Sequence, residues 1–161
     1  MNKSSKGFSL IELLIVVAII LIIAAIAIPN LLRSRIAANQ ASAVGSLRTL
    51  NTAEITYSST YNVGFTATMT YLMPPAGVNG NPTSTAAGLI DSVLASGAKS
   101  GYSFFYSPGA SDTTGRINTY YFIANPITTS TGTNYYFTDQ SGVIRQNSTT
   151  TAQASDSPIA G

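Results

Sequence analysis

The sequence predicts an α+β fold in which one long N-terminal helix packs on a C-terminal antiparallel sheet of about four strands. Sixteen apolar residues run without a break from Leu13 to Ile28, which is typical of a membrane-spanning or fully buried helix. Apolar residues then recur at three-, four- and seven-residue spacing to about Ser58, which continues a helical pattern. From Tyr102 the period changes to two, and aromatic clusters indicate strands.

The composition argues against an enzyme and against a nucleic-acid-binding protein. Charged residues make up 9% of the 161 residues, well below the roughly 25% usual in soluble domains. The chain has no cysteine and no histidine, so thiol chemistry, His-based catalysis and zinc sites lack their usual residues. Two of the eight basic residues lie in the first seven positions, and the other six balance six acids, so no basic patch is indicated. We predict no catalytic residue, no cofactor, no metal site and no nucleic-acid partner.

The N-terminal region combines a basic start with an apolar run of membrane length. Lys3 and Lys6 favour a cytoplasmic N-terminus, and residues 8–28 would cover roughly 30 Å as a helix. Glu12 is the one strongly polar residue of that run. A secretory signal cleaved near residues 24–27 is the alternative. However, an acid in an apolar segment costs insertion free energy, about 2.5–3.5 kcal/mol at the centre and less near the end, and this cost suggests a function.

A glycine, a phenylalanine, an acid five residues after the glycine and an apolar run follow one another in Gly7–Ile20. These residues resemble the prepilin signature of type IV pilins and type II secretion pseudopilins. The resemblance extends to about Arg35 and implies the pilin fold. It also implies that residues 1–7 are a leader peptide, which a prepilin peptidase cleaves between Gly7 and Phe8. The new Phe8 amine would then be N-methylated.

Glu12 has a physical role in the filament that the resemblance implies. Residues 8–30 would form first a transmembrane helix and then a polymerisation helix, packed against copies of itself with water excluded. Each Phe8 amine is then a cation in a low-dielectric core, where an unpaired charge costs several kcal/mol. We expect Glu12 of one subunit to pair with the Phe8 amine of its neighbour, which sets the register of assembly. A chance glutamate in a signal anchor is the alternative.

Pro29 stands where the helix would leave the bilayer, and many type IV pilins have a proline at this place. A proline removes one backbone hydrogen bond and kinks a helix at a cost of about 3 kcal/mol. The pattern after it is again helical, so we predict one helix to about Ser58 that is kinked near Pro29. Residues 31–58 form its amphipathic half. Two separate helices are the alternative.

Residues 59–101 are predicted as a loop region with one short helix. Proline, glycine and asparagine cluster between residues 74 and 82, which is typical of turns. The short helix is expected to begin after a cap at Ser84 or Thr85 and to end near Gly97, with an apolar stripe that faces the core.

Residues 102–147 are predicted as an antiparallel meander, and residues 148–161 as a flexible tail. Aromatic-rich strands are expected to begin at Tyr102, Thr119 and Asn134, and a fourth strand follows a turn after the third. One face of the sheet would pack on the long helix and the other would be partly wet. Many type IV pilins close this region with a disulfide, which a chain without cysteine cannot form.

The nine tyrosines and six phenylalanines are interpreted as core and sheet-face residues, which strands favour. Adhesion to surfaces or sugars, and electron transfer along stacked rings, are the alternatives. Asp112, Asp139 and Asp156 are isolated and lack the spacing of calcium ligands. The segment Asn147-Ser148-Thr149 matches the N-glycosylation pattern, which short segments also match by chance.

Taken as a whole, the sequence predicts a structural filament subunit and not an enzyme. The resemblance implies a major pilin-like homo-oligomer in a helical type IV pilus, with the prepilin peptidase and an inner-membrane assembly platform as further partners. The precursor is expected in the bacterial inner membrane and the assembled subunit in an extracellular pilus. Family roles are attachment, twitching motility and DNA uptake. Two alternatives stay open: a pseudopilin of a type II secretion system in a periplasmic pseudopilus, and a membrane-anchored binding module or enzyme.

Overall fold

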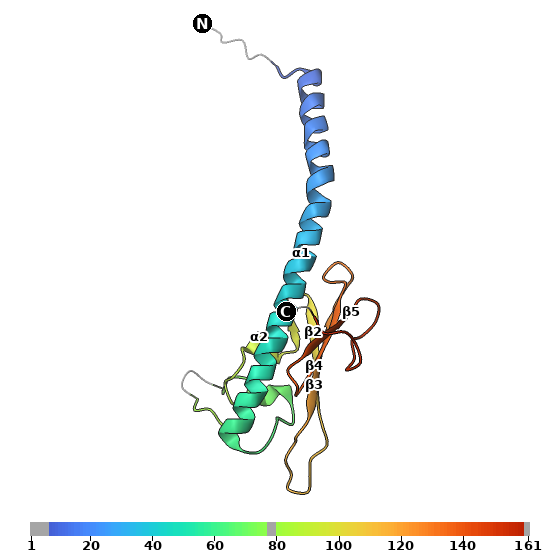
Figure 1. The fold of residues 1–161 in the computed structure, drawn as a ribbon. Helices are drawn as coiled ribbons and strands as arrows, with labels where there is room; N and C mark the ends of the chain where they lie inside the picture. Colours follow the sequence, from blue (N-terminus) through green and yellow to red (C-terminus); the bar gives the residue numbers. More distant parts are fainter. Residues whose placement is uncertain (1–6, 77–79, 160–161) are drawn as a thin grey trace. The chain divides into compact units, whose positions relative to one another are not determined.

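A computed structural model describes residues 7–76 and 80–159 (Figure 1). Most of the predicted leader, with Lys3 and Lys6, lies outside the described residues, as do the two C-terminal positions. The chain divides into two compact units, residues 1–35 and residues 36–161, and each is described by itself.

The first unit is the beginning of helix α1, which runs from Leu10 to Tyr61. The helix begins two residues after Phe8 and ends at Tyr61 rather than at Ser58. Pro29 lies inside it and does not end it, so the chain forms one helix and not two. Because proline has no N–H, the helix lacks one backbone hydrogen bond there. The kink at Pro29 stays a prediction.

The second unit contains the rest of α1 and a five-stranded sheet, together with a short 3₁₀ helix, η1, and a short α-helix, α2. The elements after α1 are η1 (Met69–Leu72), α2 (Ser92–Ala95), β1 (Ala98–Lys99), β2 (Tyr102–Pro108), β3 (Tyr120–Pro126), β4 (Tyr135–Asp139) and β5 (Ile144–Asn147). The strands lie in chain order, and every neighbouring pair is antiparallel, which makes a meander. The predicted α+β class is confirmed, with the two-residue β1 as an addition to the expected strands.

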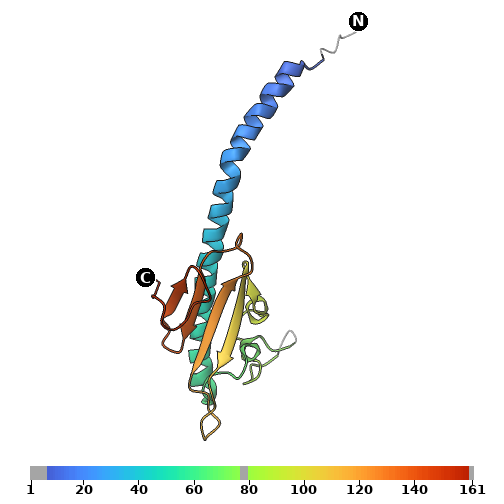
Figure 2. The same cartoon turned by 90° about the vertical axis from the view of Figure 1, so that its right-hand side faces the viewer.

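The core of the second unit lies between α1 and one face of the sheet, as Figures 1 and 2 show. The buried residues of α1 recur every three or four positions and therefore share one face. These residues are Ala43, Ser46, Leu47, Leu50, Asn51, Ala53, Glu54 and Tyr57. In β2, Tyr102 and Phe104 are buried, while Ser103 between them and Phe105 after them are exposed, as the period of two requires. The helical and strand periodicities in the sequence thus predicted which residues meet in the core.

The short helix is shorter than predicted and begins at a different cap. The side chain of Asp91 accepts a hydrogen bond from Leu94 N at 2.8 Å, and α2 covers only Ser92–Ala95. The preceding residues instead run back along η1, because Leu89 N donates to the carbonyl of Leu72 at 2.8 Å. Gly88 adopts a φ of 68°, which breaks any helix at that point. Of the predicted apolar stripe, Ile90 and Leu94 are buried, but Val93 of α2 is 56% exposed, so the stripe faces the core only in part.

The segment after β5 is not the free tail that we expected. Gln146 N donates to the carbonyl of Ser157 at 3.0 Å, and Ile159 N donates to the carbonyl of Ile144 at 2.9 Å. The returning chain thereby extends the sheet beyond β5 by backbone pairing, and Ala152 within it is buried. Composition alone predicted mobility here because serine, threonine and alanine carry little apolar surface.

Candidate functional site

The predicted processing segment precedes α1 in an irregular and exposed stretch of chain. Gly7, Phe8 and Ser9 adopt no regular structure, and Phe8 is 75% exposed. Nothing in the described structure lies within 4 Å of a Cβ built on Gly7. The Gly7–Phe8 peptide bond is therefore open to an enzyme, which is the condition that proteolysis requires.

Glu12 closes a capping box at the start of α1. Its carboxylate accepts a hydrogen bond from Ser9 N at 2.9 Å, while Ser9 Oγ accepts from Ile11 N at 3.4 Å. This reciprocal arrangement satisfies backbone donors that have no partner within the helix. The acid also lies near the positive end of the helix dipole, which favours a negative charge. The sequence contained the signal, Ser9-x-x-Glu12, which the interpretation of Glu12 as an assembly residue left unused.

Glu12 has no basic partner within the described part of the chain. The one ion pair in residues 7–76 and 80–159 joins Lys99 Nζ to an Asp91 carboxylate oxygen at 3.0 Å. The amine with which Glu12 is predicted to pair arises only when cleavage frees the nitrogen of Phe8. The intersubunit pair therefore stays a prediction about the processed protein.

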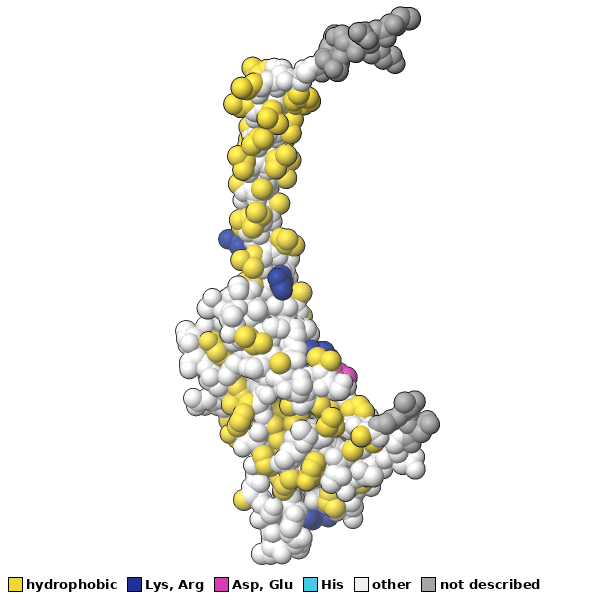
Figure 3. All heavy atoms as spheres, turned by 180° about the vertical axis from the view of Figure 1, so that it is seen from behind, with side chains coloured by type: hydrophobic (Ala, Val, Ile, Leu, Met, Phe, Trp, Pro, Cys, Tyr) yellow, Lys and Arg dark blue, Asp and Glu magenta, His cyan; other side chains and the backbone are white. Residues whose placement is uncertain are grey.

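The first unit exposes an apolar surface that its own residues do not cover. Every residue from 10 to 35 is exposed except Ala24, which is half-buried. Figure 3 shows hydrophobic side chains along the visible face of this part of α1. Among the described residues, α1 is the one helix that is long and apolar enough to cross a membrane. An exposed apolar surface of this size is unfavourable in water, so we expect lipid or other protein to cover it.

The second unit buries a carboxylate that the sequence analysis did not single out. Glu54 has an exposed fraction of 0% and accepts hydrogen bonds from Thr66 N at 3.0 Å and from Thr66 Oγ1 at 2.6 Å. Burial raises the pKa of Glu54 above its ordinary value, and the Thr66 hydrogen bonds oppose that rise only in part. Tyr106 joins the network by donating to the Thr66 carbonyl at 2.6 Å. The position of Glu54 on the buried face, one turn after Leu50, was the available signal.

A second buried polar group fastens α1 to the sheet. Asn51 Nδ2 donates to Thr138 Oγ1 at 2.8 Å, and Asn51 Oδ1 accepts from the Tyr120 hydroxyl at 3.1 Å. These bonds join α1 to β4 and β3, so they fix the position of the helix over the sheet. Because each buried group has its partner, the network specifies one packing arrangement.

The three isolated aspartates each stabilise a local turn. The carboxylate of Asp112 accepts hydrogen bonds from Thr114 Oγ1, Thr114 N, Arg116 N and Asn118 Nδ2. These bonds hold the pKa of Asp112 below its ordinary value, and the bond from the Thr114 hydroxyl has the largest effect. Asp139 accepts from Ser141 N at 2.9 Å, and Asp156 accepts from Gln153 N at 2.7 Å. No group of three or more potential metal-ligating acids occurs among the described residues.

The asparagine of the segment that matches the N-glycosylation pattern, Asn147, forms hydrogen bonds within the chain. Asn147 Nδ2 donates to a carboxylate oxygen of Asp156 at 3.1 Å, and Asn147 Oδ1 accepts from Thr149 N at 2.9 Å. Glycosylation would occupy the amide nitrogen that makes the first of these bonds. The side chain therefore acts as a brace for the turn after β5.

Comparison with known proteins identifies relatives of one kind. The family described as the prokaryotic N-terminal methylation motif matches residues 2–28. A 58-residue segment is 48% identical to the type IV major pilin protein PilA of Myxococcus xanthus, and it covers 36% of this chain and 26% of that protein. A 37-residue segment is 65% identical to the type IV wide pilus major component PilA4 of Thermus thermophilus, and it covers 23% of this chain and 28% of that protein. No solved structure gives a significant match.

The matches therefore span about a quarter of each of these two relatives, 26% and 28% of their lengths. The matched motif contains Gly7, Phe8 and Glu12, the residues on which the resemblance was based. The chain thus carries the N-terminal methylation motif of prokaryotic prepilins and is related to type IV major pilins, which confirms the resemblance predicted from the sequence.

Proposed function

We propose that this chain is a structural subunit of a type IV pilus filament, assembled through α1 after removal of residues 1–7. The observation that carries the proposal is the exposed apolar surface of residues 10–28, which contains the single acid Glu12 near its start and belongs to the matched methylation motif. The relatives in which related segments occur are described as major pilus components. A subunit of this kind needs no catalytic residue of its own.

The physical chemistry of the apolar surface suggests why Glu12 is needed. Burying a Leu, Ile or Val side chain contributes about 1.5–3 kcal/mol, so residues 10–28 are far more stable in a bilayer than in water. A filament core of packed helices is no more apolar than lipid, so the transfer from bilayer to filament gains little hydrophobic free energy. The selectivity of assembly has to come from polar groups. Glu12 and the Phe8 amine of a neighbouring subunit are the groups available at this end of the helix.

Processing and assembly require other proteins, and the proposal includes them. A prepilin peptidase would cleave the Gly7–Phe8 bond on the cytoplasmic side, the new Phe8 amine would be methylated, and an inner-membrane platform would assemble the filament. The precursor would reside in the bacterial inner membrane and the product on the cell surface. Attachment and twitching motility are the roles that such a filament would serve.

The intact mass of the protein purified from cells tests the proposal. We expect a chain that begins at Phe8 and carries one additional methyl group. A chain that begins at Met1 or after Ala27 would contradict it, because neither product has the amine that Glu12 requires. Electron microscopy of cells lacking this protein should show the loss of surface filaments. Surface filaments that persist, together with a secretion defect, would assign the chain to a periplasmic pseudopilus.

A further inference from the structure

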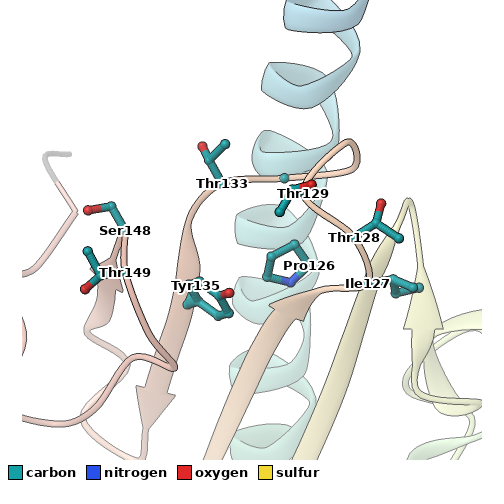
Figure 4. Close-up of a pocket in the computed structure, with 9 residues that line it drawn as sticks. Pro126, Ile127, Thr128, Thr129, Thr133, Tyr135, Ser148 and Thr149 are labelled. Carbon is teal, nitrogen blue, oxygen red and sulfur yellow. The ribbon is translucent and has the colours of Figure 1, made fainter.

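A concave site on the second unit is built from two turns at one end of the sheet. It lies between the loop that joins β3 to β4 and the turn after β5, and its volume is about 430 Å³. Figure 4 shows both turns, with Tyr135 between them and Pro126 and Ile127 on the β3 side. The site falls within the range of about 300–1,000 Å³ that is typical of small-molecule pockets.

Hydrogen bonds hold the β3–β4 loop in place. Thr131 N and Gly132 N both donate to the carbonyl of Thr128, at 3.0 and 3.3 Å, which closes a tight turn. From α1, Asn39 Nδ2 donates to the Thr131 carbonyl and Gln40 Nε2 donates to Thr133 Oγ1, each at 2.9 Å. This wall of the pocket is therefore formed before any ligand arrives, which lowers the entropy cost of binding.

The opposite wall is held by Asn147. Its Oδ1 accepts hydrogen bonds from Thr149 N and Thr149 Oγ1 at 2.9 Å and from Thr150 N at 3.2 Å. These bonds bend the chain after β5 into a turn, and Ser148 and Thr149 of this turn are among the residues that line the pocket (Figure 4). The bonds that fix both walls do not use the hydroxyl of Ser148.

The lining is rich in hydroxyl groups and contains no charged side chain. Five of its residues are serine or threonine, namely Thr128, Thr129, Thr133, Ser148 and Thr149. The hydroxyls of Thr129, Ser148 and Tyr135 make no hydrogen bond to another residue in the described parts of the chain. A hydroxyl donates and accepts at once, so these groups suit a ligand that also carries hydroxyls.

The lining also has an apolar part, and the combination of apolar groups with hydroxyl groups suits a sugar ring. The half-buried ring of Tyr135 supplies an aromatic face, and Pro126 and Ile127 supply an apolar wall beside it. A sugar presents a C–H face to such a wall and hydroxyls to the rim. Other grooves on this unit differ, since one includes Arg48 and another includes Arg116 in its lining. An ionic ligand would need such a countercharge, which this pocket lacks.

We propose that the pocket between the β3–β4 loop and the turn after β5 binds a neutral saccharide. Tyr135 stacks on the sugar ring, and Thr129 and Ser148 exchange hydrogen bonds with its hydroxyls. The site lies wholly within the second unit and needs no neighbouring subunit. Saccharide binding at this site can therefore be tested independently of filament assembly.

Titration of the full-length chain with neutral trisaccharides tests this site. The protein is labelled at its threonine methyl groups and kept monomeric in dodecylphosphocholine micelles, because detergents with sugar headgroups would compete. Maltotriose, cellotriose and chitotriose are added in turn, with trigalacturonic acid as the charged comparison. At least one neutral trisaccharide should give saturable shifts of the Thr129, Thr133 and Thr149 methyl signals. The methyl signals of Thr52 and Thr56 on α1 should stay unchanged.

Two aromatic variants show whether the pocket itself binds the sugar. Tyr135→Ala should weaken binding about tenfold or more, which corresponds to about 1.4 kcal/mol, whereas Tyr135→Phe should retain the stacking and weaken binding less. Phe105→Ala is the matched control, since Phe105 is 57% exposed on β2 and lies outside the pocket. The absence of saturable shifts with every neutral trisaccharide would overturn the proposal. Equal weakening by Phe105→Ala would also overturn it, as would pocket shifts that accompany only self-association of the chain.

Discussion

Helix α1 carries two glutamates in opposite surroundings. Glu54, near its end, is fully buried, and the chain itself supplies the groups that bond to its carboxylate. Glu12, near its beginning, caps an apolar stretch whose side chains no other part of the described chain covers. The same element is therefore a completed core helix in one unit and an uncovered surface in the other.

The two units therefore depend on different partners for their stability. The hydrophobic core of the second unit is built from side chains that lie between Ala43 and Ile159 in the sequence, and all of these side chains belong to that unit. The first unit gains stability only when lipid or other protein covers it. Substitutions in the second unit should therefore change the free energy of unfolding, whereas substitutions in the first unit should change membrane insertion or filament assembly.

The largest effect is expected from Glu12→Val. The variant should remain in the membrane, because removing an acid from an apolar segment lowers the cost of insertion. It should lose filament assembly, since the Phe8 amine of a neighbouring subunit would then be buried without a countercharge. Filament yield by electron microscopy of sheared surface material measures this. Ser9→Ala is the control, because it removes one capping acceptor and leaves the carboxylate. Normal filament yield from Glu12→Val would contradict the prediction.

A pair of leucine substitutions compares the two units directly. Leu47 is fully buried in the second unit, and Leu47→Ala should lower the free energy of unfolding by about 2–5 kcal/mol, because it leaves a cavity. Leu21 is 63% exposed in the first unit, and Leu21→Ala should leave that free energy unchanged. Urea unfolding of the full chain in detergent, followed by the tyrosine signal in near-UV circular dichroism, gives both values. Equal losses would show that the second unit depends on residues 10–35 for its stability.

A pH dependence of smaller size is expected from Glu54. Its pKa in the folded chain lies above the ordinary value of 4.5, so the folded state binds more protons than the unfolded state between the two values. The stabilising contribution is therefore complete below pH 4.5 and is lost as the pH rises through the folded pKa. Unfolding of the wild type and of Glu54→Gln over a pH series measures it. The variant should lack this loss, because an amide does not ionise.

The difference between the two pH curves isolates Glu54 from other groups. Tyr57 on α1, Tyr106 on β2 and Tyr120 on β3 face the carboxylate region, and their pKa values are raised above 10 by burial, so they stay neutral across the series. Asp91 and Asp112 have lowered pKa values, so their contribution is lost at acid pH and occurs equally in both proteins. Parallel curves for the wild type and Glu54→Gln would show that Glu54 is not the source.

The sequence predicted the parts of the fold that rest on local pattern. The apolar run, the helical spacing that continues to about Ser58 and the alternation from Tyr102 onward each depend on a period that one stretch of chain contains. The resemblance around Gly7 and Glu12 is likewise local, and comparison with known pilins confirmed it.

The parts that the sequence did not predict depend on contacts between distant segments. The role of Glu54 depends on Thr66, and the end of the chain is fixed by bonds to β5. No periodicity connects such partners, and a serine- and threonine-rich segment looks the same whether it is docked or free. The pocket beside Tyr135 escaped prediction for the same reason, because its two walls come from separate loops.

The smallest effect is expected where the end of the chain docks on β5. The carboxylate of Asp156 accepts from Gln153 N at 2.7 Å and from Asn147 Nδ2 at 3.1 Å. Asp156→Ala removes both bonds at a partly exposed site and should cost about 0.5–1.5 kcal/mol of stability. Hydrogen exchange should quicken at the amides of Gln146 and Ile159, which hold the returning chain. Ser155→Ala is the matched control and should change neither the stability nor the exchange rates. Fast exchange at these amides in the wild type would instead support the flexible tail that the sequence predicted for residues 148–161.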